Sequence, residues 1–528
     1  MYCFIRSIRK DAWIVSDVVS SKLGRVPNPV VAGGLLLSPG LLGDPGGEVW
    51  GHAWVQWWHA MALPEWPAGT LYAIGAERWP VVDPIPTAFA AIAGRLIDPV
   101  WGYNLWILVA VGTAYWGGSK LTERAGGVPW VGGAILALSP PFLGSLRSGL
   151  TEDGAVGLAA LALAYVGQKT RRSAIFAGVL LGLLCGCGLL LAWSTGLAAI
   201  VVGLVTLWRH PSRWKNLCIA AGIALLLCLP FAMAHGERMM GVGHRSGMAM
   251  GSVGDLWRLN PVGRADLASL LWPGRMDVGD AIMRTHPGYL GLSVFVVALC
   301  AHRLRLWAAF IVLALASLGA SIHFSGLDTG IVNPVAWCVE QLPMGGLVKH
   351  HGRLLLVAMV ALSALAGCGA RRLGSWTGAV MVLDLLLLAP LSAQLPVADA
   401  RPSDIVEQLD SLPPGPMLVL PLAGPGVHPQ RPLFDQRFHG RQLRLAPNMP
   451  GTLIGPLRDS ETGKWLATMG LPKPAPAPIS PPQFPGVSVV LAQGKAVAEI
   501  TQVLGPPDLS GTESAAWSVV DQGQLGVF

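Results

Sequence analysis

Long apolar runs, separated by small clusters of basic residues, are the feature that most constrains this chain. Of its 528 residues, 52% are hydrophobic and only 13% are charged, and the mean hydropathy is +0.52. Soluble domains usually carry about a quarter charged residues. A helix of about 20 apolar residues crosses the roughly 30 Å hydrocarbon layer of a bilayer. The sequence therefore predicts a mainly α-helical, polytopic membrane protein.

About eleven segments are predicted to span the membrane. They lie near residues 27–43, 101–118, 127–145, 151–168, 173–191, 194–208, 216–234, 286–302, 306–323, 353–370 and 374–394. The first is short and contains three prolines, so neighbouring helices must satisfy the backbone groups that those prolines free. Residues 1–26 lack an apolar run of signal-peptide length and are expected to stay cytoplasmic. Residues 27–394 then form the transmembrane domain.

Basic residues set the expected orientation of these spans. The chain has 37 lysines and arginines against 30 acidic residues, a formal net charge of +7. Most of the basic residues flank apolar segments, as in Lys169, Arg171 and Arg172, which is typical of cytoplasmic loops. They do not form the stripe of a nucleic-acid-binding surface, so no nucleic acid partner is expected. With an odd number of spans, the C-terminal region is predicted to be extracytoplasmic.

Residues 44–100, 235–285, 324–352 and the C-terminal region from 395 are expected on the outer side of the membrane. Residues 44–100 are rich in tryptophan and proline, which favours short helices lying at the lipid interface. In residues 395–528 the long apolar runs give way to strand-like pieces at 417–422 and 486–494, with a helix-like piece before the first. This pattern predicts a small α/β domain. Residues 471–486 are too rich in proline for either element and predict an extended loop.

Acidic residues border the predicted spans on this outer side. Asp44 follows the first span, Glu48 comes one helical turn later, and Glu152 and Asp153 begin the fourth span. Carboxylates from two loops could converge on Mg²⁺ or Mn²⁺, which prefer oxygen ligands, and one of them could act as a general base. The alternative is that they only cap helices and interact with the helix dipole.

Other polar residues give weaker indications. His52 and His59 lack a metal-ligand spacing, so the sequence favours rings that meet water at the interface. His235 and His244 are expected in a plain loop. Arginine offers a planar fork of donors to phosphate oxygens, although the cations at outer helix ends could equally meet lipid phosphates in general. The candidates for binding a donor phosphate are Arg147, Arg238, Arg245, Lys349 and Arg353.

Residues within the spans suggest little chemistry. Six of the eight cysteines, Cys185 and Cys228 among them, lie in apolar runs where a thiol behaves as a small hydrophobe. Neither a disulfide framework nor a metal-ligand spacing is predicted. Asp384 is the clear exception to spans that are nearly free of charge, and a transporter or flippase would use such residues. A catalytically inactive membrane scaffold is a third possibility.

Several short motifs resemble a known family. They are "DPVWGYNLWILVAVGTAYWGG" from residue 98, "ALSPPFLGSLRSGLTEDG" from 137, "HPGYLGLSVFVVALCA" from 286, "KHHGRLLL" from 349 and "PLFDQRFHGRQLRLAPNMPG" from 432. Together with the acidic first loop, they resemble the polyprenyl-phosphate-dependent GT-C glycosyltransferases, bacterial polytopic proteins with an external C-terminal domain. The likeness runs through most of the chain. A histidine that many members carry in the second outer loop is absent from "RSGLTEDG".

The resemblance implies a function and a location. A sugar would be transferred, with inversion, from a polyprenyl-phosphate-linked donor to a glycan, lipid or protein acceptor on the outer side of the bacterial cytoplasmic membrane. Asp44 matches the expected base or metal ligand, and Glu152 or Asp153 matches an acid that assists it. A divalent metal is an expected cofactor, and membrane lipids are expected partners.

Overall fold

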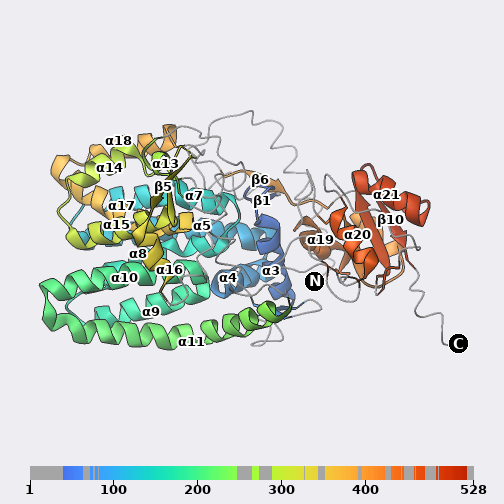
Figure 1. Ribbon diagram of the computed structural model, residues 1–528, viewed down its shortest axis with the longest axis horizontal. Helices are drawn as coiled ribbons and strands as arrows, with labels where there is room; N and C mark the ends of the chain where they lie inside the picture. Colours follow the sequence, from blue (N-terminus) through green and yellow to red (C-terminus); the bar gives the residue numbers. More distant parts are fainter. Residues whose placement is uncertain are drawn as a thin grey trace.

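The computed structural model describes most of the chain, and all statements below concern that part. The described residues are 40–62, 72–74, 78–80, 83–245, 265–272, 288–325, 327–342, 351–389, 395–402, 405–422, 430–441, 443–444, 453, 457, 460–469, 483–485 and 487–519. They form a body of packed helices and, toward the C-terminus, a smaller α/β unit (Figure 1).

The body is almost entirely helical. Several of its helices begin with proline, whose missing N–H costs nothing in the first turn. The helices of the body are α3 (Val49–Ala62), α4 (Pro84–Leu96), α5 (Pro99–Ala125), α6 (Pro129–Ala137), α7 (Pro140–Arg147), η2 (Thr151–Ala155), α8 (Val156–Tyr165), α9 (Arg171–Cys187), α10 (Leu189–Arg209), η3 (Pro211–Arg213), α11 (Trp214–Arg245), α13 (Leu267–Leu271), α14 (Leu292–Leu299), α15 (Leu304–Ser317), α16 (Pro334–Glu340), η6 (His351–Arg353), α17 (Leu354–Leu373) and α18 (Thr377–Leu387). Two short hairpins pair β2 (Tyr72–Ile74) with β3 (Arg78–Pro80) and β4 (Ser321–Phe324) with β5 (Leu327–Val332).

Apolar helices dominate this body, which confirms the prediction of a mainly helical protein with several apolar helices. Four described segments are long and apolar enough to cross a membrane: Pro129–Arg147, Leu189–Arg209, Pro211–Met233 and His351–Leu373. The segment that contains α17 lies at the centre of the helical body, because 94% of its most apolar stretch is buried. The segment that contains α11 is peripheral, with 6% buried. Helices overlap the last ten predicted spans, and the number that cross a bilayer stays a prediction.

The first predicted span, 27–43, is wrong in the part that the structure describes. Residues Gly40–Leu42 form strand β1, which pairs antiparallel with β6 (Val397–Asp399). Asn104 of α5 holds this strand, because its side chain accepts a hydrogen bond from Leu42 N and donates one to Gly40 O. A Cβ at Gly40 would lie 2.5 Å from the carbonyl oxygen of Ala398, so the close strand pairing requires glycine there. Residues before 40 lie outside the described part.

The C-terminal unit is built on a four-stranded mixed sheet in the order β7-β8-β10-β9. Strand β7 (Met417–Leu420) runs parallel to β8 (Val489–Gln493), while β10 (Ser514–Ser518) is antiparallel to both β8 and β9 (Leu509–Ser510). The helices of this unit are η7 (Val406–Ser411), α19 (Arg431–His439), α20 (Glu461–Thr468) and α21 (Lys495–Leu504). The two predicted strands coincide with β7 and β8. The unit's extracytoplasmic location and its boundaries stay predictions.

Tryptophans of the first outer loop join this unit to the body. Trp54 Nε1 donates to Gln436 Oε1 of α19 over 2.7 Å, and the ring of Trp50 packs on Phe434 at a centroid distance of 5.2 Å. The guanidinium of Arg431 also lies over the Trp50 ring, 4.3 Å from its centroid. Trp50 and Trp54 are each only 3% exposed, so the expectation that they lie at the lipid interface is wrong. Their indole N–H groups and large rings serve an intramolecular contact instead.

Both carboxylate oxygens of Asp384, in α18, accept hydrogen bonds from neighbouring residues. Its Oδ1 accepts from Tyr289 Oη over 2.5 Å, and its Oδ2 accepts from the backbone N and the Oγ of Ser293 over 2.7 and 2.5 Å. Ser293 lies in the first turn of α14, whose N–H groups have no partner within the helix. The carboxylate therefore caps α14 from a neighbouring helix, which removes the observation that favoured a transporter.

We expect Asp384→Ala to destabilise the body more than Ser293→Ala does. The first change leaves Tyr289 and the first turn of α14 without their acceptor, at a cost of roughly 2–3 kcal/mol, whereas the second removes one hydroxyl bond worth about 1 kcal/mol. Thermal unfolding of the purified full chain in detergent measures both. Equal midpoints for Asp384→Ala and the wild type would contradict the capping role.

Candidate active site

Two loops that are distant in sequence, both predicted to be on the outer side, are joined by backbone hydrogen bonds. Asp44 N donates to Arg147 O over 2.6 Å, and Glu48 N donates to Ser148 O over 2.7 Å. Gly149 has a φ of +82°, and a Cβ there would lie 2.4 Å from Val49 N. The close approach of the loops therefore requires glycine. It brings the start of α3 against the segment that begins η2.

Four side chains form a buried polar cluster where these loops meet. His52 comes from α3, Asp83 from the residue before α4, and Thr151 and Glu152 from η2. One potential ligand atom from each of His52, Asp83 and Glu152 lies within 4.8 Å of the other two. Each of these residues is at most 9% exposed. This cluster brings together an imidazole nitrogen and two carboxylates from different parts of the chain. Among the described residues, it is a group that could hold a metal cation.

Hydrogen bonds fix the ring of His52. The hydroxyl of Thr151 donates to Asp83 Oδ2, which as a carboxylate oxygen can only accept. The hydroxyl oxygen of Thr151, 2.6 Å from His52 Nδ1, therefore accepts from Nδ1–H. In the neutral ring this leaves the Nε2 lone pair directed toward Glu152, whose Oε2 is 3.4 Å away. The Thr151 hydroxyl thus fixes the ring through Nδ1, as an outer hydrogen-bond partner commonly fixes a metal-binding imidazole.

Arg353, the last residue of η6, binds the acids of η2. Its Nη2 donates to Glu152 Oε1 over 2.9 Å and to Asp153 Oδ1 over 2.7 Å, while Ser145 Oγ donates to Asp153 Oδ2 over 2.8 Å. With Asp83, these contacts set three buried carboxylates against one guanidinium. Buried charge without compensation is costly, so a proton on His52 or a bound cation is needed to offset the remainder.

Burial alone lowers the pKa of His52, but its acidic neighbours outweigh this effect. The nearby carboxylates of Asp83, Glu48 and Glu152 favour the charged ring and leave the pKa of His52 well above its ordinary value. Asp83 contributes more to this effect than Glu48, whose side chain is 58% exposed and 3.8 Å from the ring. Without a metal, the imidazolium form is therefore the one that the cluster stabilises.

Asp83 was not predicted from the sequence. It precedes a helix that starts with proline, an arrangement that usually indicates a simple N-cap. The structure places it at the N-cap of α4, yet its side chain makes no capping bond. The carboxylate instead accepts from Thr87 and Thr151 and faces His52. The feature that marks Asp83 as a functional candidate is its burial, with only 1% of the residue exposed, and burial is known only from the structure.

The predicted acids are partly brought together. Glu152 lies in the cluster, Asp153 lies beside it and shares Arg353 with Glu152, and Glu48 lies at its edge. Asp44 stands at the loop junction, 30% exposed, with its Oδ2 3.6 Å from Arg147 Nε. That Nε is buried and makes no hydrogen bond to a described residue. The helix-cap interpretation is thus inadequate for Glu152 and Asp153.

The predicted phosphate-binding residues divide into three groups. Arg147 lies at the loop junction beside Asp44. Arg353 is paired with both acids of η2, and its role as a phosphate ligand stays a prediction. Arg238 and Arg245 belong to α11 but their side chains lie outside the described part, as does Lys349.

His52 is the main correction to the sequence interpretation. Its ring does not meet water at the interface but is 8% exposed within the cluster. His59, seven residues later, binds the backbone of its own helix, with Nδ1 2.7 Å from Val55 O. The seven-residue spacing therefore carried no information, since the partners of His52 come from other elements.

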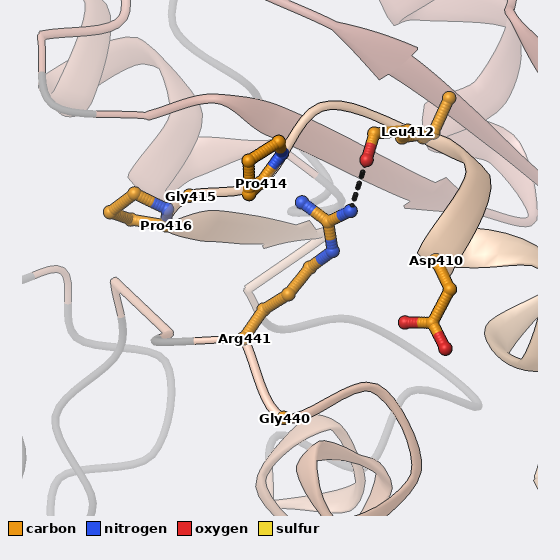
Figure 2. Close-up of a pocket in the computed structure, with 7 residues that line it drawn as sticks. All are labelled: Asp410, Leu412, Pro414, Gly415, Pro416, Gly440 and Arg441. Atoms are coloured by element: carbon orange, nitrogen blue, oxygen red, sulfur yellow. Dashed lines mark hydrogen bonds between the residues drawn. The ribbon is translucent and has the colours of Figure 1, made fainter.

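A second concavity lies in the C-terminal unit and is unrelated to this cluster. Figure 2 shows the pocket, about 470 Å³ in volume, with Arg441 directed between Leu412 and Asp410. The guanidinium donates to the carbonyl oxygens of Leu409, Leu412 and Pro413 over 2.5–2.7 Å. It therefore serves to close the end of η7.

Comparisons with known proteins give two distant structural likenesses. No protein-family model matches the chain, and no curated protein matches it. ArnT from Cupriavidus metallidurans, solved bound to undecaprenyl phosphate, is similar with a TM-score of 0.41 and 14% identity over 99% of this chain and 98% of that one. Arabinofuranosyltransferase AftD from Mycobacteria is similar with a TM-score of 0.41 and 16% identity over 86% of this chain and 37% of that one.

Replacing Arg353 with methionine is expected to destabilise the protein by about 3–5 kcal/mol, because Glu152 and Asp153 remain buried without their cation. Arg401→Met is the matched control, since the Arg401–Asp399 pair is exposed and contributes little. Chemical unfolding of the full chain in detergent compares the two. A loss no larger for Arg353→Met than for Arg401→Met would refute the role of the buried pair.

The raised pKa of His52 predicts a pH effect on stability in the presence of a chelator. Because the folded pKa exceeds the unfolded value of about 6.5, the stabilisation is complete below that pH and is lost as the pH rises through the folded pKa. We expect the midpoint of thermal unfolding to fall with rising pH above about 6.5 in the wild type, and to fall less in His52→Gln. Parallel curves for the two proteins would show that His52 does not titrate in this way.

Proposed function

We propose that the chain is a membrane glycosyltransferase that transfers a sugar from a polyprenyl-phosphate-linked donor to an acceptor at the outer face of the membrane. The observation that carries this proposal is the buried cluster at the junction of the two predicted outer loops, together with the pairing of Arg353 to Glu152 and Asp153. So many charges in an apolar helical body require a reason beyond folding. The motifs of the sequence suggest the lipid-linked donor.

Asp44 is proposed as the general base. Its side chain is partly exposed at the loop junction, so an acceptor hydroxyl can reach it, whereas the acids of the cluster are buried. Asp44 would take the proton of that hydroxyl as its oxygen bonds to the anomeric carbon of the sugar. The bond from that carbon to the phosphate oxygen breaks, and polyprenyl phosphate leaves with the electron pair. Attack from the face opposite the phosphate inverts the anomeric centre.

Arg147 is proposed to stabilise the leaving phosphate. Its Nε lies 3.6 Å from Asp44 Oδ2 and makes no hydrogen bond to a described residue, and a guanidinium can donate two parallel hydrogen bonds to phosphate oxygens. Negative charge develops on the phosphate as the sugar leaves, so a fixed cation there lowers the barrier. The apolar tail of the donor would remain in lipid while its head reaches this junction.

The cluster is proposed to hold a divalent cation through His52 Nε2, Asp83 and Glu152. Glu152 Oε2 is buried and makes no hydrogen bond to a described residue, and the cluster carries more negative than positive charge. One nitrogen and two carboxylate ligands favour Mn²⁺ over Mg²⁺, which prefers oxygen ligands alone. When bound, the ion would supply positive charge near the leaving phosphate.

Transfer of labelled sugar from polyprenyl-phosphate donors by the purified full chain in lipid tests the catalytic proposal. Asp44→Asn is expected to reduce turnover by about 10²–10⁴-fold, the usual contribution of a general base. Glu123→Gln, which alters an exposed acid paired with Lys120, is the matched control and should retain activity. Wild-type turnover in Asp44→Asn would reject the assignment, and absence of transfer from every such donor would favour an inactive scaffold.

Binding of Mn²⁺, followed by the loss of its free electron paramagnetic resonance signal, tests the cation site without an activity assay. We expect about one ion per wild-type chain, with affinity weakened at least 10-fold in Asp83→Asn and Glu152→Gln. Asp399→Asn changes an exposed acid outside the cluster and serves as control. Unchanged binding in both cluster variants would show that the ion lies elsewhere.

A further inference from the structure

Two cysteines on neighbouring helices lie unusually close together. Cys185 is in the last turn of α9 and Cys228 is near the middle of α11, with their Sγ atoms 2.6 Å apart. Both are half-buried. Non-bonded heavy atoms in contact are typically about 3.5–4.0 Å apart. The side chains are therefore oriented directly at one another across the helix interface.

The packing of the two helices fixes this opposition. A Cβ at Gly178 would lie 2.6 Å from Ala220 O, one at Gly182 would lie 2.5 Å from Leu227 Cβ, and one at Gly186 would lie 2.7 Å from Phe231 Cζ. The three glycines recur every four residues on one face of α9 and let the helices approach closely, as small residues do between membrane helices. The two helices run parallel, because successive glycines of α9 meet successive residues of α11. This alignment places Cys185 opposite Cys228.

The pair lies at the same end of the body as the acid cluster. Gly186 contacts Ile85, two residues after Asp83, and a Cβ at Gly188 would lie 2.7 Å from Glu152 Cβ. In the predicted topology this is the outer end of both helices. Thiols there are within reach of an oxidising compartment, where disulfides form and persist.

Helix α11 depends on α9 for its position. Among the described elements, α9 is the one on which α11 packs extensively, and the apolar side chains of α11 are largely exposed. Pro230, two residues after Cys228, lacks the N–H that would bond to the preceding turn of α11. A covalent bond at Cys228 would therefore restrain α11 next to the turn that lacks this hydrogen bond.

We propose that Cys185 and Cys228 form a disulfide that links α11 to α9 beside the acid cluster. The two thiols release two protons and two electrons as the sulfur–sulfur bond forms. A disulfide-bearing thiol oxidoreductase of the outer compartment accepts the electrons, and its own disulfide becomes two thiols. The bond closes a loop across 43 residues and restrains α11 relative to the body.

Peptide mapping of the full chain tests this proposal independently of any enzymatic activity. The protein is isolated from membranes without reductant, treated with oxidised glutathione, blocked with N-ethylmaleimide and digested. We expect a peptide pair joined through Cys185 and Cys228, two hydrogens lighter than the reduced pair, and alkylation of both cysteines only after reduction with dithiothreitol. Alkylation of both cysteines in the folded, oxidised protein would overturn the proposal.

Three variants sharpen the result. Cys185→Ser should make Cys228 fully reactive with the alkylating reagent without reductant. Cys187→Ser and Cys218→Ser should leave the cross-link intact, because Cys187 is buried at the end of α9 and Cys218 is exposed near the start of α11. The thermal unfolding midpoint should fall on reduction in the wild type and in Cys187→Ser but not in Cys185→Ser. A link from Cys187 to Cys228, or a midpoint equally sensitive to reduction in Cys185→Ser, would refute the assignment.

Discussion

The contact of Arg353 with Glu152 and Asp153 is the interaction on which the rest of the site depends. One guanidinium nitrogen, at the start of the most deeply buried helix, bridges two carboxylates that enter from η2. Without this cation the two acids could not remain ionised in an apolar body. With it, negative charge still exceeds positive charge, which explains why a histidine lies against the same acids.

The outer loops and the C-terminal unit are organised around this charged centre. The loop that carries Asp44 is held by backbone bonds to the loop of Arg147, and α3, which supplies His52, packs its tryptophans on α19. Strand β1 and strand β6 provide a second connection. The helix that supplies His52 is therefore held on one side by the body and on the other by the C-terminal unit. This arrangement fixes the ring more firmly than a surface loop could.

Sequence patterns predicted the elements whose signals are local. Long apolar runs indicated the helices, and β-branched runs bounded by proline and glycine indicated β7 and β8. The described end of the first predicted span, Gly40–Leu42, is a strand and not a helix, because a short apolar piece can also pair with a partner strand such as β6. Trp50 and Trp54 were assigned to the lipid interface because an indole ring suits either an interface or a protein contact. Composition alone does not distinguish these environments.

The candidate site shows the same division. The sequence by itself determined that this is an apolar, helical chain and that acids border its outer loops, because hydropathy and charge are properties of neighbouring residues. Only the tertiary structure decided that Asp83 and His52 join Glu152, that Arg353 neutralises acids rather than standing free, and that Cys185 faces Cys228. These contacts join residues from 31 to 201 positions apart, and their distances depend on how helices pack, which no local pattern records.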